Sequence, residues 1–288
     1  MSDKFVKIFE VGPRDGLQNE EDIIPTNEKI ELIDALSGLG FKNIEATAFV
    51  SPKWVPQMAD SSDVMAGINR NPNVRYSALT PNLQGFEKAL DAKVDEVAVF
   101  ASASETFSQK NINCSIAESL ERFVPLMERA RHHNIPVRGY VSCVVGCPYE
   151  GEIKPQAVAD VANALMDLGC YEVSLGDTIG VGTPQSTTQM LKAVQAEIDP
   201  AKLAGHYHDT KDIALDNVKA SLDMGLRVFD SAIGGLGGCP YAPGAKGNVS
   251  TLALVQMLEA DGWSTGLDLD GLVKVETIMA KLARQNHA

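Results

Sequence analysis

Apolar segments rich in β-branched residues alternate, from one end of the chain to the other, with segments in which apolar residues recur every three to four positions. The first pattern predicts buried strands, and the second predicts amphipathic helices. One such helix carries Val158, Val161, Leu165 and Leu168, and Gly169 ends it. The predicted strands span residues 5–11, 43–49, 74–79, 95–101, 137–145, 172–177, 203–208 and 228–233.

No segment rich in proline, glycine or serine divides these alternating units. We therefore predict one domain over residues 1–288, an α/β fold of the (β/α)₈ TIM-barrel type with an additional C-terminal helix at about 269–284. A doubly wound open sheet is the alternative, and such sheets usually bind a nucleotide at a glycine-rich turn. The segment 234–240 comes closest to that turn, but Pro240 takes the place of the final glycine. The sequence favours the barrel.

The composition is that of a globular protein, with 44% hydrophobic and 22% charged residues among 288. The N-terminal segment carries no signal or transit pattern, and no apolar run is long enough to span a bilayer. Five cysteines without a CxxC pair predict reduced thiols, so the cytoplasm is the expected compartment. The net charge of −13 disfavours binding to nucleic acid or to an anionic membrane. An anionic small-molecule substrate would need local positive charge or a metal.

Polar residues gather where predicted strands end, which is where (β/α)₈ barrels place their chemistry. His206 and His208 share one face of a strand, so both imidazoles can hold one ion. A pair of hydrogen-bonded histidines is the alternative, which Asp15 at the end of another predicted strand disfavours. Imidazole, carboxylate and amide ligands favour Mg²⁺ or Mn²⁺ over a closed zinc site. The residues at these ends are Arg14, Asp15, Asp177, Thr178, His206, His208, Gly237, Gly238, Cys239 and, shortly after, Asn248. Glu45 lies on the strand predicted over 43–49.

Four of these residues have both a catalytic and a structural interpretation. The planar donor fork of Arg14 suits a carbonyl oxygen that becomes an enolate oxygen, but it also suits a salt bridge at the rim. Glu45 and Asp177 are either members of ion pairs or parts of a reactive network. Cys239 is either a small packing residue or a reactive group on a pliable loop, because glycines surround it.

Several blocks of the sequence resemble the 3-hydroxy-3-methylglutaryl-CoA lyase family of the metal-dependent DRE-TIM superfamily. The resemblance extends from about residue 5 to residue 263. The blocks that carry it are Glu10-Val11-Gly12-Pro13-Arg14-Asp15-Gly16-Leu17-Gln18-Asn19-Glu20, the segments 49–58, 109–115, 140–143 and 146–151, Gly176-Asp177-Thr178-Ile179-Gly180, and Gly235-Leu236-Gly237-Gly238-Cys239-Pro240-Tyr241.

The resemblance implies a retro-Claisen cleavage of 3-hydroxy-3-methylglutaryl-CoA to acetyl-CoA and acetoacetate, with Mg²⁺ or Mn²⁺ as the cofactor. It implies Asp15, His206, His208 and Asn248 as metal ligands. It implies Arg14, Cys239, Glu45, Asp177 and His206 as catalytic residues, with Arg14 stabilising the enolate and Cys239 as a mobile acid/base. It implies substrate contacts for Arg14, Gln18, Tyr140 and Thr178. An acyl-CoA partner, a homodimer, and roles in leucine degradation and ketone-body formation are further expectations.

The sequence also departs from the pattern of this family. Lys211, Asp212 and Ile213 stand where members often have Tyr-Gly-Gln, and Leu252 replaces a usual glutamate. A related lyase for a different acyl group and a CoA-binding barrel with impaired catalysis are therefore alternative functions. A condensing synthase of the same superfamily is a further alternative. The Gly-Gly-Cys-Pro-Tyr loop favours a lyase over a synthase.

Overall fold

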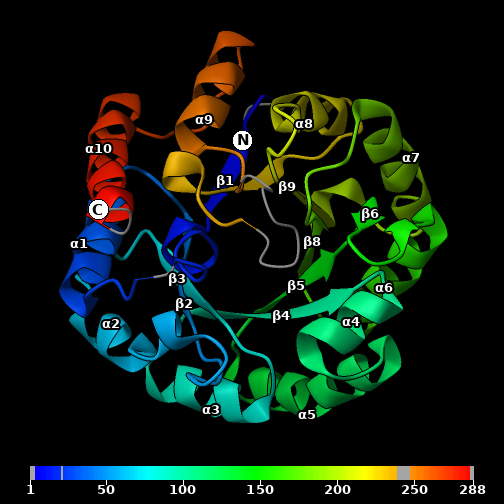
Figure 1. Cartoon of the computed structure of the whole chain (residues 1–288), viewed down its shortest axis with the longest axis horizontal. Helices are drawn as coiled ribbons and strands as arrows, with labels where there is room; N and C mark the ends of the chain where they lie inside the picture. The colour runs from blue at the N-terminus through cyan, green and yellow to red at the C-terminus, as the bar shows by residue number, and fades with distance from the viewer. Residues whose placement is uncertain (1–3, 21, 239–246, 286–288) are drawn as a thin grey trace.

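Eight parallel strands close into a barrel, as the sequence predicts (Figure 1). The computed structural model describes residues 4–20, 22–238 and 247–285 of the chain, with side chains up to residue 280. The strands are paired around the barrel in the order β1-β10-β9-β8-β5-β4-β3-β2. Their bounds are β1 Lys7–Glu10, β2 Asn43–Ala48, β3 Arg75–Leu79, β4 Glu96–Ser102, β5 Val137–Ser142, β8 Glu172–Asp177, β9 Leu203–Tyr207 and β10 Val228–Ser231. Each lies within a predicted strand or differs from it by one residue at an end.

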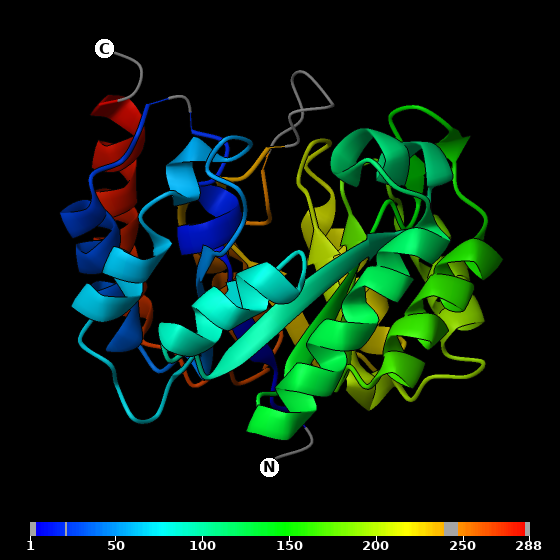
Figure 2. The ribbon, with the colours of Figure 1, turned by 90° about the horizontal axis from the view of Figure 1, so that it is seen from below.

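Helices cover the outside of the barrel (Figures 1 and 2). They are α1 Thr26–Ser37, α2 Ser61–Gly67, α3 Leu83–Asp91, α4 Glu105–Ile112, α5 Ile116–His133, α6 Pro155–Leu168, α7 Pro184–Val194, α8 Ala214–Asp223, α9 Thr251–Ala260 and α10 Leu269–Gln285. The additional C-terminal helix is confirmed as α10, which packs between α1 and α9. None of the described helices combines the length and the apolar composition that crossing a bilayer requires.

Short elements after the strands were not predicted. The five-residue π-helix η1 (Gly12–Gly16) follows β1 and carries Arg14 and Asp15, which the sequence alone places at a strand end. A small antiparallel hairpin of β6 (Gly146–Cys147) and β7 (Gly151–Glu152) follows β5. The 3₁₀ turns are η2 Pro56–Met58, η3 Pro200–Lys202 and η4 Ile233–Gly235.

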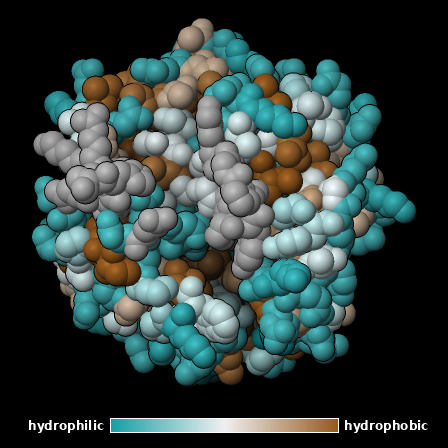
Figure 3. Space-filling model, in the orientation of Figure 1, coloured by the Kyte–Doolittle hydropathy of each residue, from teal (hydrophilic) through white to brown (hydrophobic). Residues whose placement is uncertain are grey.

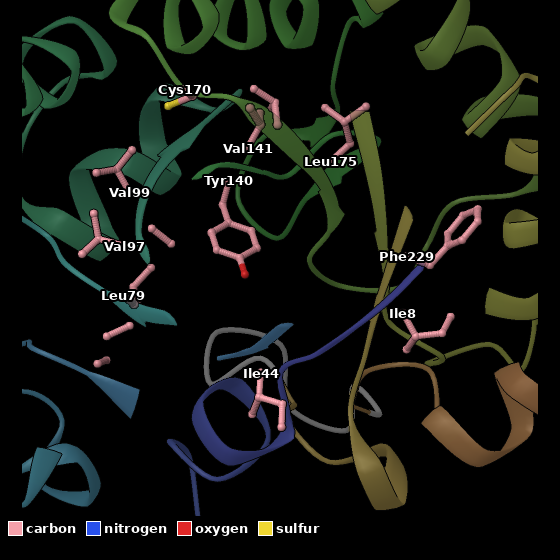
Figure 4. Close-up of a cluster of buried hydrophobic side chains, with 14 of the residues drawn as sticks. Ile8, Ile44, Leu79, Val97, Val99, Tyr140, Val141, Cys170, Leu175 and Phe229 are labelled. Atoms are coloured by element: carbon pink, nitrogen blue, oxygen red, sulfur yellow. The ribbon is translucent and has the colours of Figure 1, made fainter. Parts of the chain in front are cut away.

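Two kinds of residue alternate along the strands. Apolar side chains such as Ile44, Val141 and Leu175 are fully or almost fully buried in the core between strands and helices. Tyr140 instead points its hydroxyl toward the centre of the barrel, away from its neighbour Val141 (Figure 4). The interior of the barrel is unusually polar, because Arg138, Tyr140 and Asp230 bond to one another there. Branched apolar residues usually fill this space.

Candidate active site and metal centre

A cavity of about 750 Å³ opens at the carboxyl ends of the strands. The space-filling view of Figure 3 looks along the barrel and shows apolar and polar side chains intermixed on this face. Of the predicted site residues, the cavity is lined by Arg14, Asp15, Gln18, Tyr140, Thr178, His206 and His208. A second, smaller cavity of about 400 Å³ lies between the β6–β7 hairpin and α7, and none of the predicted site residues lines it.

Three predicted ligands meet on the floor of the larger cavity. One ligand atom each from Asp15, His206 and His208 lies within 4.8 Å of the others, and all three residues are buried or nearly so. His206 lies near the end of β9, and His208 is the first residue after this strand. Their ring centroids are 5.5 Å apart. One position on β9, one directly after it and one on η1 thus converge, although His206 lies 191 positions after Asp15 in the sequence.

Asn248, the fourth predicted ligand, adjoins this group. Its Nδ2 donates to Asp15 Oδ2 at 2.7 Å and to the Leu236 carbonyl at 3.0 Å. Only glycine fits at position 237, where φ is +100°, because a Cβ there would lie 2.6 Å from Asn248 Nδ2 and 2.8 Å from the Asp15 carbonyl oxygen. Glycine at this position therefore lets the loop after β10 pack against η1, where Asn248 contacts Asp15.

The donor set fits a divalent cation. His208 Nδ1 and Asn248 Oδ1 are buried and have no hydrogen-bond partner among the described residues. Unpaired buried polar atoms are costly, so their presence beside a carboxylate and a second imidazole points to a ligand that completes them. Asp15, His206, His208 and Asn248 together offer the mixed nitrogen and oxygen ligands that six-coordinate cations accept.

Arg14 lies directly beside the ligand group. Its Nη1 donates to Asp15 Oδ1 at 2.5 Å, and its Nε donates to Glu45 Oε2 at 2.6 Å. The Tyr140 hydroxyl donates to the same Glu45 oxygen at 3.3 Å, and its ring lies 5.6 Å from the guanidinium carbon. Arg14 is therefore fixed on two sides while it still lines the cavity.

Burial and charge shift the pKa values of this group. Burial alone would raise the pKa of Asp15, but the guanidinium of Arg14, together with His206, His208 and the hydrogen bond from Asn248, outweighs burial and lowers this pKa. Burial lowers the pKa of His208 to about 4, with the nearby His206 as the next cause. Burial raises the pKa of Glu45 in spite of the Arg14 charge. At neutral pH Asp15 is thus a carboxylate and His208 is a neutral imidazole, the protonation states that metal ligation needs.

The remaining predicted residues occupy different places. Gln18 donates to Asp15 Oδ1 at 2.9 Å, so it supports the ligand group from the cavity wall. Thr178 accepts a hydrogen bond of 2.8 Å from the Cys143 amide. Asp177 accepts from the amides of Val181 and Gly182, so it fixes the loop after β8 and has no described hydrogen bond to the Arg14 network. Cys239 lies outside the described residues.

Sequence reasoning missed two buried carboxylates behind the site. Asp230 on β10 bonds to His206, and Glu10 at the end of β1 accepts from the amides of Gly12 and Ile233. Both interrupt apolar strands, which is the same signal that singled out Glu45. Their partners could not be read from the sequence, because Ile233 lies 223 positions from Glu10.

Comparisons with known proteins agree with this architecture. A curated mouse protein named 3-hydroxy-3-methylglutaryl-CoA lyase, cytoplasmic, is 58% identical over 96% of this chain and 81% of its own length. A Pseudomonas aeruginosa protein named 3-hydroxy-3-isohexenylglutaryl-CoA/hydroxy-methylglutaryl-CoA lyase is 56% identical over 98% of this chain and 95% of its own length. A solved HMG-CoA lyase from Acinetobacter baumannii, in complex with coenzyme A and 3-methylmalate, superposes with a TM-score of 0.93 at 38% identity, covering 97% of this chain and 92% of that one.

The family model described as HMGL-like matches residues 5–279, which include every described residue of the candidate site. With this match and with relatives above 50% identity over nearly the whole chain, the protein belongs to the HMGL-like family.

Proposed function

We propose that this protein is a carbon–carbon lyase that cleaves 3-hydroxy-3-methylglutaryl-CoA to acetyl-CoA and acetoacetate with the help of a divalent cation. The observation that carries the proposal is the grouping of Asp15, His206 and His208 beside the Arg14 guanidinium on the cavity floor. The names of the mouse and Pseudomonas aeruginosa relatives support the substrate. The coenzyme A complex of the Acinetobacter baumannii relative supports an acyl-CoA thioester as the partner.

Asp15, His206, His208 and Asn248 would hold the cation, and their carboxylate and amide oxygens support Mg²⁺ or Mn²⁺ as its identity. A cation bound there supplies a Lewis acid, which lowers the pKa of the tertiary hydroxyl of the substrate. Asp15, His206 and His208 all line the cavity, so a cation that they held would be accessible to substrate oxygens there.

Side chains of the protein then stabilise the negative charge that develops on the thioester fragment. A base takes the hydroxyl proton, and the hydroxyl carbon becomes the ketone of acetoacetate. The electron pair of the broken C–C bond passes to the thioester fragment as an enolate. The Arg14 guanidinium donates to the enolate oxygen, and Asp15 and Glu45 hold it in place for that contact. A proton delivered to the enolate carbon gives acetyl-CoA, and we assign that proton to the Cys239 thiol. Glu45, Asp177 and His206 stay predictions as catalytic residues, with positioning roles supported by their contacts.

A larger acyl group is a second candidate substrate. The name of the Pseudomonas aeruginosa relative includes the isohexenyl homologue. The cavity wall includes the apolar side chains of Val50, Leu79, Phe100, Phe107 and Phe123, which would accept a branched hydrocarbon.

The test is product analysis with purified, chelator-stripped protein. We expect 3-hydroxy-3-methylglutaryl-CoA to give equimolar acetoacetate and acetyl-CoA only after Mg²⁺ or Mn²⁺ is added back. The isohexenyl homologue in a parallel reaction measures the acyl preference, and His208→Ala is the matched control for metal use. Full cleavage in EDTA contradicts the metal requirement, and no cleavage of either thioester with metal present contradicts the lyase.

The cytoplasm is the proposed compartment, which the name of the mouse relative supports. The four described cysteines, Cys114, Cys143, Cys147 and Cys170, are free and buried, as reduced thiols would be. A homodimer is proposed from the family resemblance, and sedimentation equilibrium of the purified chain tests it.

A further inference from the structure

A second carboxylate lies behind His206, on the side away from the cavity. Asp230 on β10 is the register partner of His206 on β9, and its Oδ2 lies 3.1 Å from His206 Nδ1. The other ring nitrogen, Nε2, faces Asp15 Oδ2 at 3.8 Å. The imidazole thus lies between two carboxylates, of which only Asp15 lines the cavity.

Asp230 is held in place by donors. Arg138 donates from Nη2 to Oδ1 at 2.7 Å and from Nη1 to Oδ2 at 3.1 Å, and Ser174 donates to Oδ2 at 2.7 Å. Arg138 is itself anchored, because its Nε donates to Glu172 at 2.8 Å. The side chains of Arg138 and Asp230 are completely buried, so this bidentate pair is shielded from water and has one geometry.

These contacts decide which nitrogen of His206 carries the proton. A carboxylate that receives three donor contacts from Arg138 and Ser174 is ionised and can only accept a hydrogen bond. His206 Nδ1 must therefore be the donor. In the neutral imidazole, the form that binds a metal, this leaves the lone pair on Nε2, the nitrogen that faces Asp15. His208 differs, since its Nδ1 has no described partner.

We propose that Asp230 is a positioning residue: clamped by Arg138 and Ser174, it holds His206 as the Nδ1–H tautomer and aims the Nε2 lone pair at the metal position. Carboxylates that accept from the second nitrogen of a ligating histidine fix ring orientation and strengthen the ligand in this way. The inference rests on the proposed function, because that function identifies the metal site. The tautomer of His206 depends only on its contact with Asp230, so it can be measured without metal or substrate. It also assigns Nε2 to ligation, so the substrate proton must be taken by a different group.

The first test uses the wild-type chain without metal. Protein labelled with ¹⁵N-histidine is measured by long-range ¹H–¹⁵N NMR, and the His206 signals are assigned by their loss in His206→Gln. We expect a protonated Nδ1 and an unprotonated Nε2. A protonated Nε2 overturns the proposal, whether or not the protein cleaves any thioester. Conversely, the expected tautomer in a protein that cleaves no thioester refutes the proposed function and leaves the Asp230 assignment standing.

The second test measures Mn²⁺ affinity directly, by the electron paramagnetic resonance signal of free Mn²⁺. Asp230→Asn preserves the side-chain shape but replaces an acceptor that fixes the tautomer, and we expect affinity to fall by about 10–100-fold. The matched control is Glu172→Gln, which removes the other carboxylate on Arg138 and leaves the contact between Asp230 and His206. Near-wild-type affinity in folded Asp230→Asn, or an equal loss in Glu172→Gln, overturns the proposal. Circular dichroism establishes folding, and an unfolded Asp230→Asn leaves the NMR result on the wild type as the deciding measurement.

Discussion

The side-chain amide of Asn248 donates a hydrogen bond of 2.7 Å to the carboxylate of Asp15, across 233 positions of sequence. The contact joins the loop after the last barrel strand to the helix η1 after the first. Asn248 faces Asp15 with its nitrogen here, while its buried Oδ1 has no described partner. A cation held by both residues would replace this hydrogen bond, with Oδ1 as the ligand atom of Asn248.

The substitution Asn248→Asp tests this relationship through stability. Without metal it places a second carboxylate against Asp15, and two like charges 4 Å apart repel by about 4 kcal/mol at an effective dielectric constant of about 20. With metal the same carboxylate becomes a ligand. We expect a lower melting temperature than wild type in EDTA, and a larger rise on adding Mn²⁺, measured by thermal unfolding.

The chain offers a matched control for that experiment. Asn43 donates to Glu96 at 3.3 Å inside the barrel, and neither residue belongs to the ligand group. Above pH 7, where Glu96 with its pKa of about 7 is ionised, Asn43→Asp therefore also places two carboxylates against each other, and no metal binds there to offset their repulsion. Its loss of stability should be the same with and without Mn²⁺. An equal Mn²⁺ response in Asn248→Asp and in wild type would show that Asn248 is not a ligand.

Arg14→Lys should slow turnover far more than it weakens substrate binding. The lysine keeps the positive charge but cannot contact Asp15 and Glu45 with a planar fork as the guanidinium does. We expect kcat to fall by about 10²–10³, comparable to the loss of one oxyanion donor, with a smaller change in KM. Steady-state kinetics with saturating Mg²⁺ measures both. Arg129→Lys, at the surface pair with Glu87, is the control and should leave both constants unchanged. A raised KM at normal kcat would assign Arg14 to substrate binding instead.

The barrel could be predicted from the sequence because each strand is a short apolar run followed by a periodic helix. The pairing of His206 with His208 followed from the two-residue period of a strand, and the position of Asp15 near them followed from the common end of barrel strands. The π-helix around Arg14 could not be predicted, since a five-residue turn of that kind has no periodic pattern.

The polar interior could be predicted only in part. Arg138 and Asp230 are visible as charges inside apolar strands, which predicts that each is paired. Their bond to each other spans 92 positions, and no pattern along the chain specifies which buried cation meets which buried anion. For Asp177 the sequence suggested a catalytic role, because the residue ends a strand. In the structure its described hydrogen bonds go to backbone amides of the next loop, which the sequence pattern did not indicate.

Cys239 lies outside the described residues, and its role as the acid/base comes from the family resemblance. A thiol with an ordinary pKa of about 8.5 exchanges protons near neutrality, whereas a serine hydroxyl hardly does. Cys239→Ser should therefore keep fold and metal content while kcat falls by roughly 10²–10⁴. Alkylation mapped by mass spectrometry should label this thiol in the free enzyme and less with a substrate analogue bound. Cys170→Ser, at a buried thiol that does not line the cavity, is the control. Normal turnover of Cys239→Ser refutes the assignment.

Glu10 should make the stability of the fold depend on pH. It is completely buried, and its carboxylate accepts from the Gly12 and Ile233 amides at 2.8 and 2.9 Å and from the Thr251 hydroxyl at 2.7 Å. Burial raises its pKa from 4.5 to about 7, although these hydrogen bonds oppose the rise. Between those two values the folded state holds a proton that the unfolded state has released. The free energy of unfolding should therefore fall as pH rises from about 4.5 to 7, by about 1.4 kcal/mol per unit.

Glu10→Gln removes this titratable group and keeps an acceptor for the two amides. The difference in the free energy of unfolding between variant and wild type therefore isolates the contribution of Glu10 to the pH dependence. Other groups that titrate in the same range, such as Glu96 with its pKa raised to about 7, are present in both proteins and cancel. From pH 4.5 to pH 7 the wild type should lose about 3 kcal/mol relative to Glu10→Gln, measured by urea unfolding at each pH. A difference that does not change with pH would mean that Glu10 stays ionised in the folded state. Its three hydrogen bonds, which fix the loops bearing Asp15 and Asn248, would then outweigh the cost of burial.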